Sequence, residues 1–245
     1  MRTVGLIGGT GLDHWDFVED ALQIETPFGS TTGRIGVFGF PRARLLFLPR
    51  HGAAHTVSPH KVNYRANLFA LRQAGAEIII AVNAVGGITS KFSPGTLVVP
   101  SQVVDYTWGR AHSFSDHTDF PLIHFDFTEP FSAGLREELL SAGKAAGVEL
   151  VDGACIAVTQ GPRLETAAEI ERLEEDGSDL VGMTTMPEAA LAREIGLDYA
   201  SISVVSNWAA GKSDAPITMA DIERTLSGAM QSVRLLLLNL VGATG

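Results

Sequence analysis

The sequence predicts an α/β fold in which one twisted, mainly parallel mixed sheet is flanked by helices. Two observations carry this prediction: short apolar runs that suit buried strands recur along the chain, and segments of helical periodicity separate them. The 245 residues, 45% of them hydrophobic, contain no repeat, low-complexity tract or linker that would divide the chain. We therefore expect residues 1–245 to form a single domain around one substantial core.

The expected elements alternate along the chain. Apolar runs predict strands at 3–7, 45–48, 78–82, 97–104, 154–158 and 200–205. Helical periodicity covers 61–74 and, after a good cap at Ser132, 132–146; another helix is expected to begin near Thr166. In the segment 187–195, Pro187 suits a first helical turn and Gly196 a helix end. The apolar stretch 235–241 is much shorter than the ~20 residues that span a bilayer, so it is expected to be the buried end of a last helix.

Composition excludes several classes of partner. The formal net charge is −10 and no block of Lys or Arg occurs, which argues against nucleic-acid and anionic-membrane binding. No export signal is evident, so a cytoplasmic protein is expected. The one cysteine, Cys155, lies in an apolar run and is expected to be a buried free thiol.

The longest region without periodicity is 107–129, which is dense in aromatic residues. We expect a neighbouring subunit to cover it. His112, Asp116 and His117 in this loop could be read as metal ligands, but an interface is the more common use of such residues, and no metal site is expected.

Two groups near strand ends indicate a site for a small anion. Arg50 and His51 follow the apolar run 43–49, and an arginine offers a planar fork of donors to phosphate. The turn Gly8-Gly9-Thr10-Gly11 follows the first strand and offers backbone amides and a hydroxyl. A nicotinamide-dependent oxidoreductase is an alternative, although a G-x-G-x-x-G spacing fails because Thr10 stands where a glycine is needed, and no clean helix follows Leu12. A plain tight turn is also possible.

Four further groups follow expected strands: VNAVGG at 82–87, GPRLET at 161–166, GMTTMPE at 182–188 and SNWA at 206–209. Ligands of open α/β sheets bind beyond the carboxyl ends of strands, so these groups are candidates for the same site. Each also has an ordinary explanation. Glu165 could favour the positive end of a helix, and Asn207 could simply form a turn.

Taken in order, GGTGL, TPFG, RHG, VNYRAN, NAVGG, GPRLET, MTTMPE and SNWAA resemble the trimeric purine nucleoside phosphorylase and methylthioadenosine phosphorylase family, over nearly the whole chain. The resemblance implies a phosphate site formed by Thr10, Arg50, His51, Asn83, Ala84 and Thr184. It also implies that Met183 packs under the ribose. The protein would be a homotrimer in which His124 reaches the neighbour's site.

The resemblance also implies what base and sugar are bound. Relatives that act on 6-oxopurines carry Glu and Asn at the positions of Glu165 and Asn207, whereas relatives that act on 6-aminopurines carry Asp at the positions of Asn207 and Ala209. Leu164 and Trp208 are expected beside them. A carboxylate accepts a hydrogen bond from the protonated N1 of a 6-oxopurine, while adenine offers only a lone pair there. Ile217, Met219 and Ile222 would form an apolar pocket for a 5′-methylthio group, although they also suit the buried face of a helix.

The expected reaction is phosphorolysis of S-methyl-5′-thioinosine, with Asn207, Glu165, Arg50 and His51 as catalytic residues, inorganic phosphate as co-substrate and no cofactor. Alternatives within the class are an inosine and guanosine phosphorylase and, less favoured, a methylthioadenosine phosphorylase. Outside it, the nicotinamide-dependent oxidoreductase and a nucleoside-binding protein without activity stay open.

Overall fold

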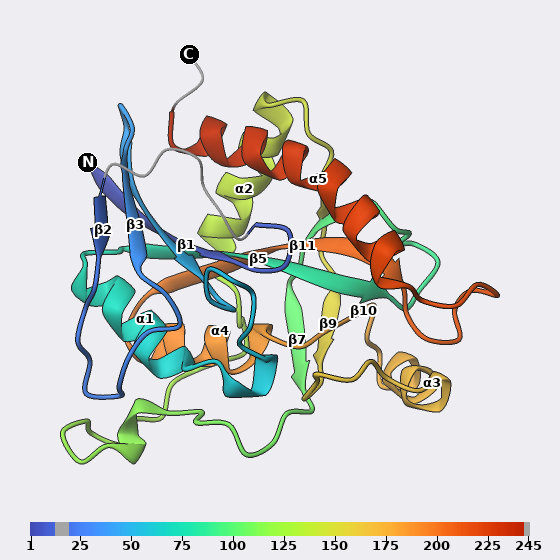
Figure 1. Cartoon of the computed structure of the whole chain (residues 1–245), viewed down its shortest axis with the longest axis horizontal. Helices are drawn as coiled ribbons and strands as arrows, with labels where there is room; N and C mark the ends of the chain where they lie inside the picture. The colour runs from blue at the N-terminus through green and yellow to red at the C-terminus, as the bar shows by residue number, and fades with distance from the viewer. Residues whose placement is uncertain (13–19, 243–245) are drawn as a thin grey trace.

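The structure is a computed structural model that describes residues 1–12 and 20–242. It confirms the predicted α/β class. The described strands form one mixed sheet with helices on both faces (Figure 1). In chain order the strands are β1 (Arg2–Gly8), β2 (Asp20–Leu22), β3 (Ile35–Gly39), β4 (Ala43–Pro49), β5 (Ile78–Gly87), β6 (Leu97–Val99), β7 (Gln102–Asp105), β8 (Val151–Asp152), β9 (Cys155–Val158), β10 (Leu180–Gly182) and β11 (Asp198–Trp208).

The helices begin where the sequence supplies a cap. They are α1 (Tyr64–Gln73), α2 (Ala133–Ala145), α3 (Ala167–Glu175), α4 (Thr185–Glu194) and α5 (Met219–Leu240). The side chains of Ser132 and Thr166 accept from backbone amides in the first turns of α2 and α3, as expected of cap residues. Helix α1 begins three residues later than the start of the predicted segment 61–74, because Asn63 caps it and a 3₁₀ turn at Pro59–Lys61 precedes it.

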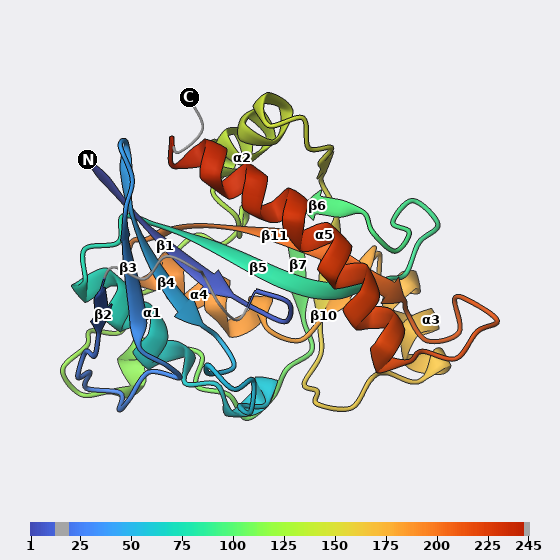
Figure 2. The same ribbon diagram turned by 45° about the horizontal axis from the view of Figure 1, so that its top comes forward.

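Strand β5 is apolar throughout its first half because helices cover both faces of the sheet at this strand. Helices α1 and α4 cover one face of the sheet, and α2 and α5 cover the other (Figure 1; α5 crosses the sheet in Figure 2). Because successive side chains of a strand point to opposite faces, Ile79 and Ala81 pack with the first pair of helices, whereas Ile78 and Ile80 pack with the second. All four side chains are at most 2% exposed. A strand buried on both faces has no place for a polar alternation.

The sheet opens beside the middle of β5. Strand β1 pairs with its first half, at 78–81, and β10 pairs with its end, at Gly86 and Gly87. Between these pairings, residues 82–85 are paired only with β11 among the described strands. The chain leaves β1 at Gly8 and β4 at Pro49 next to this opening, so polar groups from several segments can meet there.

Three predicted strands differ most from the structure in their bounds. The run 97–104 is not one strand: it is broken at Pro100 and Ser101 into β6, which pairs with β11 and β8, and β7, which pairs with β9. Strands β5 and β11 are longer than predicted, so the groups at 82–87 and 206–208 lie within strands and not after them. Their register shifts between Val205 and Asn207, which leaves Ser206 as an extra residue, as in a β-bulge.

Gly87 is expected to tolerate no side chain. A Cβ at this position would lie 2.0 Å from the carbonyl oxygen of Phe92. Because that atom belongs to the backbone, Gly87→Ala is expected to lower the free energy of unfolding by about 3 kcal/mol, measured by urea denaturation. The small residue here serves the packing of the protein's own chain.

Gly228→Ala is the matched control. Gly228 is exposed in the interior of α5, and a Cβ there would meet no atom within 4 Å. The same chemical change is therefore expected to raise the free energy of unfolding by roughly 0.5–1 kcal/mol, because alanine favours the helix. If the two substitutions changed the free energy of unfolding equally, the close approach of Gly87 to the Phe92 carbonyl could not explain the effect of Gly87→Ala.

Two smaller expectations can be compared with the structure. Cys155 begins β9 and is only half-buried, so the prediction of a fully buried thiol is wrong; partial burial raises the pKa of this thiol. Within residues 1–12 and 20–242, none of the helices is both long enough and apolar enough to cross a bilayer. The expected absence of a helix after Leu12 concerns residues outside the described part of the chain.

Candidate active site

A cavity of about 410 Å³ lies at the opening of the sheet beside β5. It is lined by groups from the ends of β1 and β4, from the middle of β5, from the segments before α3 and α4, and from β11 and the start of α5. Of the residues predicted from sequence, those that line it are Thr10, Arg50, His51, Ala84, Leu164, Glu165, Met183, Thr184, Asn207, Ala209, Ile217, Met219 and Ile222. The cavity therefore brings together the three predicted regions for anion, base and 5′ substituent.

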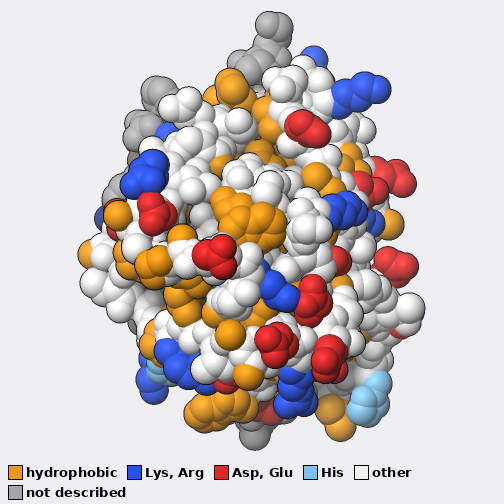
Figure 3. Space-filling view, turned by 90° about the vertical axis from the view of Figure 1, so that its right-hand side faces the viewer, with side chains coloured by type: hydrophobic (Ala, Val, Ile, Leu, Met, Phe, Trp, Pro, Cys, Tyr) orange, Lys and Arg blue, Asp and Glu red, His pale blue; other side chains and the backbone are white. Residues whose placement is uncertain are grey.

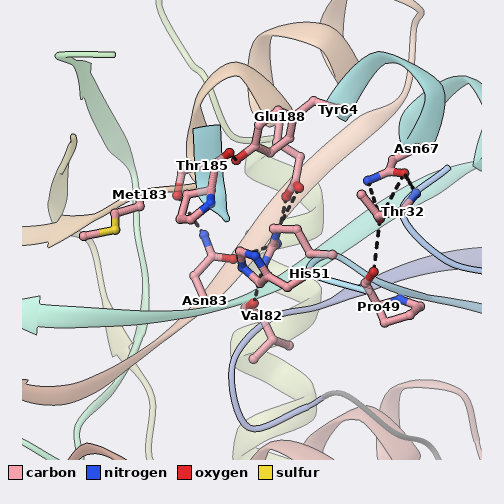
Figure 4. A network of polar contacts seen from close by, with 12 residues as sticks. Thr32, Pro49, His51, Tyr64, Asn67, Val82, Asn83, Met183, Thr185 and Glu188 are labelled. Atoms are coloured by element: carbon pink, nitrogen blue, oxygen red, sulfur yellow. Dashed lines mark hydrogen bonds and ion pairs between the residues drawn. The ribbon is translucent and has the colours of Figure 1, made fainter. Parts of the chain in front are cut away.

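Arg50 is buried, with 1% of its surface exposed, and its guanidinium is held by Glu188 from α4. Nε and Nη2 donate to the two carboxylate oxygens of Glu188, both at 2.9 Å, and Nη1 donates to the carbonyl of Val82 at 3.0 Å. Glu188, Val82 and Asn83 lie close together around this guanidinium (Figure 4). The prediction that the bidentate fork of Arg50 faces phosphate is wrong: Glu188 occupies that fork.

The positive charge of Arg50 is firmly held. Burial alone would lower the pKa of Arg50, but the carboxylate of Glu188 outweighs burial and raises that pKa above its ordinary value. Tyr199 donates its hydroxyl to Glu188 at 2.9 Å, and burial followed by the charge of Glu188 raises the pKa of Tyr199 well above normal. Arg50 therefore stays a cation, and Tyr199 a neutral donor, across the pH range in which the protein would work.

Asn83 was expected to contact phosphate, but its side chain is turned elsewhere. It is 3% exposed and is not among the residues that line the cavity. Its Oδ1 accepts from Nη2 of Arg50 at 3.1 Å, and its Nδ2 donates to the hydroxyl of Thr185 at 2.8 Å. The side chain of Asn83 thus links Arg50 to the first turn of α4, directly after Thr184.

The glycine turn covers the arginine. A Cβ on Gly9 would lie 2.6 Å from Nη1 of Arg50, so only glycine lets the turn approach the guanidinium this closely. Thr10 then reaches the cavity, where its hydroxyl is 3.4 Å from Nε2 of His55. His55, which sequence analysis did not select, has a positive φ of 50° and its ring lies 4.7 Å from that of His51.

Nδ1 of His51 is bonded to the protein's own backbone. Its Nδ1 lies 2.7 Å from the carbonyl oxygen of Val57, and since a carbonyl only accepts, Nδ1 carries the hydrogen. The other nitrogen, Nε2, can then donate to an anion only when the imidazole is protonated. The predicted donation from His51 to phosphate therefore requires the imidazolium form.

At the base end of the cavity, Glu165 is held by Thr159. The Thr159 hydroxyl donates to Oε1 of Glu165 at 2.6 Å. The capping box at the start of α3 is formed by Glu169 with Thr166, so the cap of this helix does not depend on Glu165. Glu165 is left with Oε2 for a ligand.

Asn207 lies in β11 directly after the extra residue, Ser206. The Ser206 hydroxyl is 2.7 Å from Oδ1 of Asn207, and Nδ2 donates to the carbonyl of Trp208 at 2.7 Å. Asn207 is therefore not a turn residue, and its amide is held with the oxygen toward Ser206. Ala209, 3% exposed, follows on the same cavity wall and brings no charge.

Another part of the cavity wall, from 217 to 222, is apolar. Ile217, Met219 and Ile222 line the cavity, and Ile222 also packs in the core on this side of the sheet. Leu164 and Met219 are 44% and 61% exposed. Hydrophobic side chains also gather near the centre of the face viewed in Figure 3, with charged side chains around them.

Two of the predicted substrate-binding residues lie outside this cavity. Trp208 is half-buried and is not among the lining residues, although its carbonyl orients Asn207. His124 is exposed on the loop between β7 and α2 and does not line the cavity of its own chain. Its predicted place in a neighbour's site stays a prediction.

In the comparison with known proteins, the model of the phosphorylase superfamily matches residues 3–242. The chain belongs to that superfamily. Among similar proteins, a probable S-methyl-5′-thioinosine phosphorylase of Xanthomonas campestris pv. campestris is 51% identical over 223 residues, which is 89% of each chain. A 6-oxopurine nucleoside phosphorylase of Pyrococcus furiosus is 38% identical over 91% of this chain and 85% of its own. A solved structure of methylthioadenosine phosphorylase from Schistosoma mansoni in complex with adenine has a TM-score of 0.94 and 31% identity, covering 100% of this chain and 93% of its own.

Several side chains of this phosphorylase were missed by sequence analysis. Glu188 stands in the quoted motif MTTMPE, where an acidic residue in an otherwise buried segment was the available signal. Arg110 had no such signal. It donates to the carbonyls of Met183 at 2.8 Å, Met186 at 2.6 Å and Gln160 at 2.9 Å, and so ties the aromatic loop to the segments beside the cavity. Burial lowers the pKa of Arg110.

The residues that could have been metal ligands are used otherwise. His112 pairs with Asp105 at 3.6 Å, and Asp116 pairs with Arg65 at 3.5 Å. Within the described part of this phosphorylase, no three His, Cys, Asp or Glu side chains are grouped so that they could hold a metal ion.

Proposed function

We propose that the protein cleaves S-methyl-5′-thioinosine with inorganic phosphate, giving hypoxanthine and 5-methylthioribose 1-phosphate. One observation carries the proposal. Glu165 and Asn207 share a single cavity with the phosphate candidates Arg50 and Thr10 and with the apolar side chain of Ile222. The 6-oxopurine and 5′-methylthio specificities named for the Xanthomonas and Pyrococcus relatives agree with this set of groups.

The proposed reaction uses inorganic phosphate as co-substrate and no cofactor. As the C1′–N9 bond lengthens, positive charge grows on the sugar and negative charge on the base. Phosphate held near Arg50, Thr10 and Thr184, with backbone amides near Ala84, would add to C1′ as that bond breaks. The electron pair leaves with the purine, and N7 takes a proton from solvent. We propose that His51, as the imidazolium, donates to phosphate, and that Met183 packs against the ribose.

The base would be read by Glu165 and Asn207. Oε2 of Glu165 would accept from N1–H, and the amide of Asn207 would bind O6 and the protonated N7. Leu164 and Ala209 would pack beside the ring. Because the carboxylate has no hydrogen to give, adenine, with a bare lone pair at N1, would leave a buried acceptor unpaired, at a cost of about 1–3 kcal/mol. A methylthioadenosine phosphorylase is therefore the less favoured alternative.

The test is an activity panel over adenine, hypoxanthine and guanine nucleosides with either a 5′-methylthio or a 5′-hydroxyl group, each with and without phosphate. S-methyl-5′-thioinosine is expected to have the highest kcat/KM, about tenfold or more above inosine, because the side chains of Ile217, Met219 and Ile222 suit a methylthio group and offer no hydrogen bond to a hydroxyl. Equal rates for the two 5′ groups would favour an inosine and guanosine phosphorylase. Fastest cleavage of the adenine compound would contradict the proposal.

We further propose that residues 1–245 act as one phosphorylase domain in a homotrimer, with His124 near the neighbour's sugar site. Trp108, Leu122 and Ile123 on the same loop are exposed, by 71%, 74% and 43%, and an apolar surface of this kind suits a subunit contact. Light scattering that gives a single-chain mass at assay concentrations would contradict this assembly.

A further inference from the structure

The hydroxyl of Thr159 lies where it can orient the carboxylate of Glu165, the residue proposed to bind the base. It directly follows β9, its backbone N–H donates to the carbonyl of Gly182 at 2.9 Å, and its own carbonyl accepts from Arg110 at 3.2 Å. These two bonds hold the residue in place. The hydroxyl is then 2.6 Å from Oε1 of Glu165, and since an ionised carboxylate can only accept, Thr159 is the donor.

This hydroxyl also limits where Glu165 can turn. Glu165 borders two cavities: the one that holds the candidate active site and a second, of about 300 Å³, which Thr159 lines as well. A glutamate between two open spaces has more than one accessible rotamer. The bond from Thr159 keeps Oε1 engaged. Among residues 1–12 and 20–242 no hydrogen bond to Oε2 is found, so Oε2 is the oxygen available to a ligand.

The two 6-oxopurines make different demands on such a carboxylate. Guanine presents N1–H and a neighbouring 2-amino group, and a carboxylate binds two parallel donors best with both oxygens. Hypoxanthine presents N1–H alone, so the second oxygen needs a donor from the protein. In this chain that donor is already in place on Oε1.

We propose that Thr159 is a specificity-determining residue that favours hypoxanthine over guanine by engaging Oε1 of Glu165. The inference rests on the proposed function, in which Glu165 faces N1 of the base. Thr159 acts through Glu165 and is a positioning residue. Without its hydroxyl, a bound hypoxanthine leaves Oε1 unpaired, whereas a bound guanine can satisfy that oxygen with its 2-amino group.

The test compares Thr159→Val, which keeps the shape and removes the hydroxyl, with Thr159→Ser, which keeps the hydroxyl. Two ratios are measured. The first is the Kd of free hypoxanthine divided by that of free guanine, obtained by calorimetry. The second is kcat/KM for the inosine-type nucleoside divided by that for the guanosine-type nucleoside with the same 5′ group. Thr159→Val is expected to move both ratios toward guanine by about tenfold, mainly through weaker binding of hypoxanthine. Thr159→Ser is expected to keep the wild-type ratios.

Other results would overturn the inference: unchanged ratios in Thr159→Val, a shift further toward hypoxanthine, or a serine variant that behaves like the valine variant. Thr159→Ala gives the same comparison if the valine variant does not fold. Failure of the proposed function is a separate result, since it would appear as a lack of phosphorolysis by the wild-type protein. The binding of free bases still tests Thr159 in that case, and a wild-type protein that binds neither base would overturn the inference as well.

Discussion

Arg50→Met is expected to reduce phosphate-dependent cleavage by roughly 10²- to 10³-fold and to lower the free energy of unfolding by about 3–5 kcal/mol. The loss of activity follows from removing the guanidinium that lines the cavity near Thr10. The loss of stability has a different cause. Glu188, 1% exposed, would be left with its charge buried and with the Tyr199 hydroxyl as its remaining hydrogen-bond donor among the contacts described.

The measurements are steady-state kinetics at varied phosphate concentration and urea denaturation. Arg224→Met is the matched control: Arg224 is exposed and pairs with Asp221 on the surface of α5, so its loss is expected to leave the free energy of unfolding nearly unchanged. Adding Glu188→Leu to Arg50→Met removes the unpaired charge and should recover most of the stability without recovering activity. A stable and active Arg50→Met protein would refute the assignment of Arg50 to the phosphate site.

Replacing Asn207 and Ala209 together by aspartate is expected to move base preference toward adenine, by roughly 10²-fold or more in the ratio of kcat/KM values. The 6-amino group of adenine is a donor that carboxylates accept, whereas the O6 of hypoxanthine would meet two acceptors. The amide of Asn207 now donates to the Trp208 carbonyl, so an aspartate in its place must turn away from that oxygen and toward the base.

Glu165→Gln on the same background should increase adenine activity further, since the amide can donate to N1 while its oxygen still accepts from Thr159. The control is Ala209→Asn alone, which adds the bulk of an aspartate to a site that is 3% exposed but adds no carboxylate. If the control variant and the double variant changed the base ratio equally, size and not charge would explain the effect. If the double variant kept the wild-type ratio of kcat/KM values for adenine and hypoxanthine nucleosides, the proposed position of the base beside Asn207 and Ala209 would be wrong.

The sequence by itself determined the fold class and most of the elements, because the cause of each is local. Ser132 and Thr166 cap helices by bonding to amides within three residues. The apolar run of β5 requires burial on both faces wherever the strand lies. Motif resemblance also selected about half of the residues that line the cavity, since the residue types at a binding site are set by the ligand's chemistry.

Only the tertiary structure decided how those side chains are turned and where the strands end. The fork of Arg50 is taken by Glu188, which is 138 residues away in the chain, and Asn83 is engaged by Arg50 and Thr185 instead of facing the cavity. Periodicity cannot find such bonds, because they depend on which segments meet across the opening beside β5. For the same reason the break after β6 and the bulge at Ser206 became visible only once the neighbouring strands were in place.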